Sequence, residues 1–141
     1  MDINKIFNLF DSGSEVREKE EVKVAFIDFK DHPSYWLGMF KKLILNHKVF
    51  EKKIIYFLNQ TDPEFDTSNL EESGAELAFE RAWYYINKFN INEVAHKESI
   101  NLIIDDNLLK TMTHAIEFFQ EREQYERCAH IKKILDFTKT L

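Results

Sequence analysis

The sequence has few of the residues that make tight turns and cross-links. Its 141 residues include three glycines and two prolines, too few for the many turns of a β-sandwich or β-barrel. It has a single cysteine, Cys128, which cannot form an internal disulfide bond. The scarcity of turn-forming residues favours helices, and the single thiol indicates a reducing compartment.

Long apolar runs and a positive net charge are also missing. The most hydrophobic stretch, residues 54–58, is far shorter than the roughly 20 residues that cross a bilayer. The 25 acidic and 19 basic residues leave a net charge of −6, so no overall positive field attracts phosphate or anionic lipid. No charged-then-apolar leader with a small-residue cleavage site is present. We therefore expect a cytoplasmic protein without a membrane partner, for which nucleic acid is a disfavoured partner.

The residues that are present predict an all-α fold. Hydrophobic residues make up 44% of the chain, enough for one core, so residues 1–141 are expected to form a single helical domain. Apolar residues recur every three to four positions, which is typical of helices that bury one face. The predicted helices are residues 2–10, 35–47, 49–58, 75–89, 92–101, 106–119 and 125–137. We predict a compact helical bundle of five to seven helices that ends in an antiparallel helical hairpin, residues 106–137.

Several boundaries remain open in the sequence. Residues 22–30 alternate as a strand would but also fit one helical face, and we favour the helix. A kink is expected near Asn46 and His47. The polar residues 60–74 form the one long predicted loop and a candidate subdivision of the domain, and residues 1–21 are a candidate mobile segment.

The motifs offer little for catalysis. The chain has no glycine-rich phosphate loop or nucleophile elbow, and the acidic neighbours of Cys128 disfavour a reactive thiolate. A Glu-x-x-His pair, Glu93 and His96, suits a metal site in a helical bundle, but no second pair exists. His114 and Glu117 occur in the reversed order. We expect no cofactor and lean against an enzyme, and we keep a metal-binding enzyme or carrier built from these residues and Glu80 as an alternative.

Aromatic residues exceed what one buried stripe of each helix would hide. Trp83, Tyr84 and Phe118 are therefore candidate partner-binding residues, because tryptophan and tyrosine are preferred interface anchors. The predicted function is a non-catalytic macromolecule-binding protein, an adaptor, regulator or assembly factor, whose partner is another protein or a second copy in a homodimer. Nucleic-acid binding through the lysine-rich face from Lys41 to Lys53 is a further alternative. The abundant lysine, asparagine and isoleucine are typical of AT-rich coding in some bacteria and many phages, so the protein is a candidate phage product.

One segment resembles a known motif. Residues 115–135, AIEFFQEREQYERCAHIKKIL, combine a polar turn, an aromatic residue, a glutamate, two small residues and a basic, aliphatic run. This pattern is similar to the UVR motif, the helical hairpin of nucleotide-excision-repair subunits and some stress regulators, although the arginine usual after the small pair is absent. The resemblance covers about one seventh of the chain and implies a protein-docking hairpin. Tyr125, Glu126 and His130 from this segment complete the candidate partner-binding residues.

Overall fold

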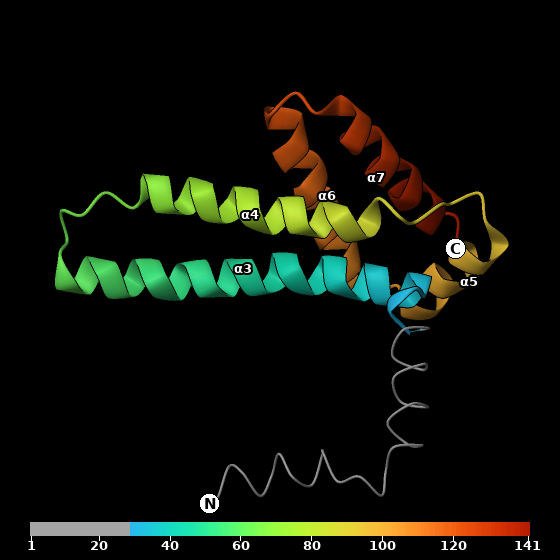
Figure 1. Ribbon diagram of the computed structural model, residues 1–141, viewed down its shortest axis with the longest axis horizontal. Coiled ribbons are helices and arrows are strands. Elements are labelled where there is room, and N and C mark those ends of the chain that lie inside the picture. The colour runs from blue at the N-terminus through green and yellow to red at the C-terminus, as the bar shows by residue number, and fades with distance from the viewer. Residues whose placement is uncertain (1–28) are drawn as a thin grey trace, which may run out of the picture. The chain divides into compact units, whose positions relative to one another are not determined.

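The structure is a computed structural model that describes residues 29–141, and the regular structure in that range is entirely helical (Figure 1). The helices are α3 (Pro33–Thr61), α4 (Ser68–Ile86), α5 (Val94–Ile103), α6 (Asp106–Glu121) and α7 (Tyr125–Thr138). The predicted all-α fold is therefore confirmed for these residues. The predictions for residues 1–21, and most of the helix-or-strand question at residues 22–30, lie outside the described residues.

The helix α3 is a single continuous helix, so the predicted kink near Asn46 and His47 is wrong. Nothing at these positions breaks the helical hydrogen bonds, since neither residue is proline or glycine. The imidazole Nε2 of His47 lies 2.7 Å from Glu51 Oε2, one turn further along the same helix. The helix ends where the Thr61 hydroxyl donates back to the Phe57 carbonyl, shortly before Pro63.

The connection to α4 is shorter than predicted. Helix α4 begins at Ser68 and ends at Ile86, whereas residues 75–89 were expected, and the 60–74 loop shrinks to residues 62–67. Before the helix, the Asp66 carboxylate accepts a hydrogen bond from the Ser68 backbone N–H at 3.0 Å, and this bond lowers the pKa of Asp66. Helices α3 and α4 contact each other and run side by side in Figure 1.

A tight turn joins α6 to α7. The backbone N–H of Gln124 donates to the Phe119 carbonyl at 2.9 Å, and the N–H of Glu123 donates to the Gln120 carbonyl at 3.0 Å. This pair of bonds is a Schellman motif, and Glu123 has the left-handed conformation (φ 58°) that glycine usually supplies there. The turn lets α7 pack against α6.

The core of the Pro33–Leu141 unit lies between the first half of α3 and the other four helices. Its fully buried large side chains are Leu37, Phe40, Ile44, Ile86, Phe89, Ile100, Leu108, Met112, Phe119, Ile131 and Ile134. Tyr125, at the start of α7, is 60% exposed, and the first buried residue of that helix is Ile131. Among residues 29–141, no helix combines the length and apolar character that crossing a bilayer requires.

The α6 N-terminus is fixed by a charged cap, which leads to a pH-dependent stability. Asp105 Oδ1 accepts from the Leu108 N–H at 2.7 Å, and Asp105 Oδ2 lies 2.9 Å from Lys41 Nζ. The Lys41 hydrogen bond and then the Leu108 N–H lower the pKa of Asp105. We expect Asp105→Ala to reduce the unfolding free energy by about 1 kcal/mol at neutral pH.

The pH window follows from the sign of this shift. Because folding lowers the pKa of Asp105, this carboxylate stabilises the protein at pH values above its unfolded-state pKa of about 3.9. That stabilisation is lost as the pH falls through the folded-state pKa. Urea unfolding at several pH values should therefore show the wild-type advantage shrinking below about pH 4. Asp105→Asn, which keeps a capping oxygen but no charge, is the matched control and should lose less. A difference independent of pH would contradict the charged cap.

Candidate protein-docking face

Among the described residues, the part of the α3–α4 pair that is farthest from the core contains no buried side chain. In α3, the last buried residue is Ile44, although the helix continues to Thr61, and the first buried residue of α4 is Phe79. We call residues 45–61 and 68–78 the arm. Figure 1 shows the arm extending beyond α5, α6 and α7. Ala75 packs against the core, but none of the arm's apolar side chains is buried within the described residues 29–141.

Exposed apolar residues repeat along both helices of the arm. Phe50 and Phe57 are seven residues apart on α3, and Leu70, Leu77 and Tyr84 follow the same spacing on α4. All five are between 47% and 67% exposed. A seven-residue spacing keeps side chains on one side of a helix, as in the contact seam of helices that pack together. We call these five residues the docking face.

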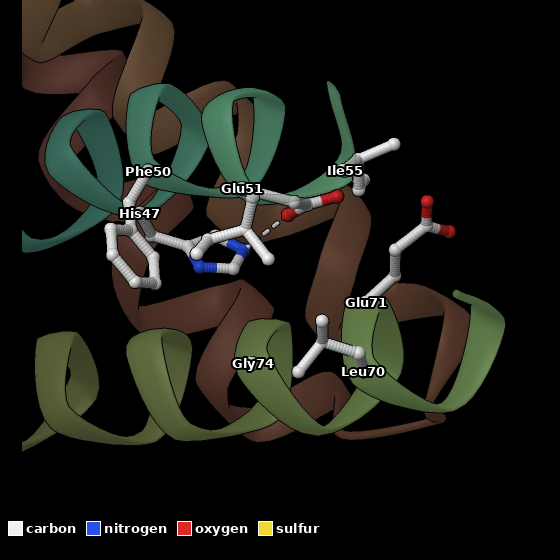
Figure 2. Close-up of a pocket in the computed structure, with 8 residues that line it drawn as sticks. His47, Phe50, Glu51, Ile55, Leu70, Glu71 and Gly74 are labelled. Carbon is white, nitrogen blue, oxygen red and sulfur yellow. Dashed lines mark ion pairs between the residues drawn. The ribbon is translucent and has the colours of Figure 1, made fainter. Parts of the chain in front are cut away.

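A groove joins the two halves of this face. Its apolar lining is Phe50, Ile54 and Ile55 from α3 and Leu70 from α4, beside Gly74. His47, Glu51 and Glu71 also line it, and Figure 2 shows these polar side chains between the two helices. The helices approach closely at Gly74, where a methyl group would lie 3.3 Å from His47 Cε1. The groove volume is about 60 Å³, far below the roughly 300–1,000 Å³ of small-molecule sites. The groove is therefore suited to one side chain of a macromolecular partner.

Two bases flank the apolar residues of the docking face, whereas the carboxylates Glu51 and Glu71 lie in the groove between the helices, where Glu51 pairs with His47 and Glu71 accepts from Thr67. Lys53 lies three residues after Phe50 and four before Phe57, and Arg81 lies four after Leu77 and three before Tyr84. These spacings put each base on the same side of its helix as the docking face. Neither Lys53 nor Arg81 forms an ion pair within residues 29–141. Beyond them, Lys88 Nζ lies 4.2 Å from the ring centre of Tyr84.

Two acidic residues of α4 pair with arginines at the α6–α7 turn and on α7. Glu76 Oε1 is 3.8 Å from Arg122, and Glu80 Oε1 is 2.7 Å from Arg127. Further carboxylates line an open hollow there between the arm and the end of α6, namely Glu51, Glu71, Glu72 and Glu121. Carboxylates are therefore concentrated toward α6, although Glu51 and Glu71 also line the groove of the docking face.

Three of the predicted partner-binding residues are used inside the protein. Phe118 is buried and stacked on Phe79, with ring centres 4.2 Å apart. Trp83 and His130 make an edge-to-face contact, and His130 Nε2 lies 2.9 Å from the Ile86 carbonyl oxygen. These residues join α4 to the α6–α7 pair and offer little surface to a partner.

The other three are accessible but separated in the chain. Tyr84 belongs to the docking face, whereas Tyr125 and Glu126 are exposed at the start of α7. The UVR-like segment therefore exposes its aromatic residue and its glutamate and uses His130 for internal packing.

The predicted metal ligands are not brought together. His96 is buried: its Nδ1 accepts the Asn90 backbone N–H at 2.7 Å, and its Nε2 lies 3.0 Å from Glu93 Oε2. Because Nδ1 accepts, the ring proton is assigned to Nε2, which faces the carboxylate. Both ring nitrogens of His96 thus have protein partners.

The second pair stands apart on α6. His114 Nδ1 and Glu117 Oε2 are 3.8 Å apart and well exposed, and Glu80 pairs with Arg127. Within residues 29–141, no three histidine, cysteine or acidic side chains form a cluster that would hold a metal ion.

Cys128 lies in a partly buried position between α6 and α7. Its Sγ is 3.4 Å from the Ile116 carbonyl oxygen, and burial raises the pKa of the thiol. A raised pKa favours the protonated thiol, which is the unreactive form. The geometry therefore agrees with a packing role for Cys128.

The lysines of α3 do not share one face. Lys41 pairs with Asp105, and Lys48 lies near Glu117 in a partly buried position where desolvation lowers its pKa. Lys52 lines a hollow with Lys48 on that same side, toward α6. Lys53 instead follows the docking face. The predicted nucleic-acid surface is thus divided between two sides of the helix.

Most of the docking face was missed at the level of sequence. Phe50 and Phe57 were assigned to the predicted helix of residues 49–58 without being named as partner-binding residues, and Leu70 was placed in the 60–74 loop. The available signal was a second apolar repeat of seven, running beside the stripe that contains Phe40 and Ile44. Comparisons with protein families, with curated proteins and with solved structures found no match for this chain.

Proposed function

We propose that this protein is a non-catalytic binding protein that uses the docking face to hold another protein, as an adaptor, regulator or assembly factor. The observation that carries the proposal is the pair of exposed apolar repeats, Phe50 with Phe57 and Leu70 with Leu77 and Tyr84. Leaving five large apolar side chains in water has no benefit for folding, whereas contiguous exposed apolar surface is typical of interaction sites.

The structure of the arm supports this role. Each stripe lies on a long helix whose other end is fixed in the core, so the face is presented by rigid elements and needs little ordering when a partner binds. The groove between Phe50 and Leu70 adds a seat for one inserted side chain.

The proposal also includes a cellular location and a second protein-binding surface. A cytoplasmic location fits the single cysteine and the net charge of −6. The α6–α7 pair, as a helical hairpin with UVR-like residues 115–135, would provide an additional contact through Tyr125 and Glu126, which are both exposed.

Site-specific photocrosslinking tests the proposed function. A photoreactive phenylalanine analogue placed at Leu77 or Phe57 of the full chain, in its native host, should give a defined adduct with one other protein. The same analogue at Glu72, an exposed residue on the other side of α4, is the matched control and should give none.

Two outcomes would overturn this function. One is an equal yield of adducts from Leu77 and Glu72, which would mean that the apolar stripes do not select a partner. The other is an adduct from Tyr125 alone, which would move the binding surface from the arm to α7.

A further inference from the structure

We propose that the docking face takes an amphipathic helix of another protein whose polar flanks are acidic. This inference rests on the proposed function and names the class of partner. Its three supporting observations are the seven-residue repeats, the groove, and the two bases beside the repeats, Lys53 and Arg81, which form no ion pair within residues 29–141.

The repeats and the groove indicate a helical partner. Parallel or antiparallel helices meet along side chains that recur every seven residues, with one side chain inserted between those of the facing helices. Two neighbouring helices with such stripes, separated by a groove, form the surface into which an amphipathic helix packs its apolar side. The α4 stripe from Leu70 to Tyr84 spans about 21 Å, or about four turns of a bound helix.

The charges indicate an acidic partner. Lys53, Arg81 and Lys88 border the apolar stripes, and Lys53 and Arg81 make no ion pair within the described part of the chain. The nearby carboxylates already have partners inside the protein. Glu76 and Glu80 pair with arginines. In the groove, Glu51 pairs with His47 and Glu71 accepts from the Thr67 hydroxyl. Carboxylates flanking the apolar side of a bound helix would meet the bases and gain charge complementarity, which favours such partners over basic ones.

A second copy of the chain is a poorer occupant. In a two-fold dimer the same surface appears on both sides of the contact, and its groove carboxylates already have partners, Glu51 with His47 and Glu71 with Thr67. A second copy would therefore bring further bases to Lys53 and Arg81 and, among the described residues of the groove, no unpaired carboxylate. Like charges across an interface disfavour association.

A membrane surface is a poorer occupant as well. Interfacial helices bind membranes by laying one continuous apolar side into the lipid, whereas here the apolar residues flank a groove between two helices. The net charge of −6 also repels an anionic bilayer.

The test uses two synthetic helical peptides of four turns with identical leucines on one side. One carries glutamates on its flanks and the other carries lysines. Fluorescence anisotropy with the full chain at low salt should show the glutamate peptide binding at least about tenfold more tightly than the lysine peptide. Added salt should narrow this difference, because it screens charges at the rim of an interface.

Charge reversal supplies the decisive variant. Lys53→Glu with Arg81→Glu should remove the preference for the glutamate peptide or invert it. Lys132→Glu with Lys133→Glu, at exposed positions on α7, makes the same change in net charge and should keep the preference. Leu77→Glu should abolish binding of both peptides, and circular dichroism would verify that each variant is folded.

The outcomes separate this inference from the proposed function. Equal binding of both peptides, lost in Leu77→Glu, would overturn the acidic partner and leave protein docking in place. No binding of either peptide would overturn the helical partner, and the crosslinking at Leu77 decides the function independently. A dimer that Leu77→Glu dissociates, or binding to phosphatidylglycerol vesicles in place of the peptides, would also overturn the inference.

Discussion

Phe119→Ala is expected to lower the free energy of unfolding by about 3–5 kcal/mol. Phe119 on α6 is fully buried and contacts the rings of Phe79, Trp83 and Phe118, with ring centres between 5.4 and 6.3 Å apart. It thereby joins α4 to α6, and removing the ring would leave a cavity among aromatic side chains that cannot easily close. Urea unfolding followed by circular dichroism measures the loss.

Phe65→Ala is the control for Phe119→Ala. Phe65 lies in the connection between α3 and α4 and is about half exposed, so the same chemical change there should cost less than about 1 kcal/mol. A loss at Phe119 no larger than the loss at Phe65 would mean that the aromatic cluster does not hold α4 to α6. A large loss of unfolding free energy in Phe119→Ala would also destabilise the attachment of the docking face, because the arm is anchored through this cluster.

The sequence predicted most of the helices because burial has a periodic signature. The spacing of Leu108, Met112, Ala115 and Phe119 predicts α6 and its inward side, and the structure places all four in the core. Boundaries were harder to predict, since they depend on competition between local signals. The polar residues 60–74 were predicted as a loop, whereas α4 already starts at Ser68. The expected kink at His47 had no breaker residue to support it.

The candidate site was less accessible from the sequence than the fold. Periodicity shows which residues share a side of a helix, but it does not show where the partner helix ends. The spacing of Phe50 and Phe57 fits a helix, but it is the structure that shows both side chains to be more than half exposed. For the same reason Trp83 and Phe118 were candidate anchors, although they are taken up by contacts to Phe119 and Phe79. The extent of burial is a property of the tertiary arrangement.

The second large effect is expected at His96, the residue that the sequence presented as a metal ligand. His96→Ala should lower the free energy of unfolding by about 2–4 kcal/mol. The imidazole accepts the Asn90 N–H at 2.7 Å, and its ring centre lies 5.4 Å from that of Trp36 and 5.2 Å from that of Phe89. Alanine would leave the Asn90 N–H without this acceptor and open a cavity beside two rings.

The same variant separates a structural role from a metal role. If His96 acts through Asn90 and the aromatic rings, the unfolding free energy of the wild type should be equal in EDTA and in added zinc or iron, while His96→Ala is less stable in all three. His114→Ala, the same change at an exposed histidine, should leave stability within about 0.5 kcal/mol of the wild type. A wild type that is stabilised by metal and loses this gain in His96→Ala would instead restore the metal-binding alternative. It would also weaken the case for a binding protein without catalysis, because a bound metal would supply the reactive group that the described side chains do not assemble.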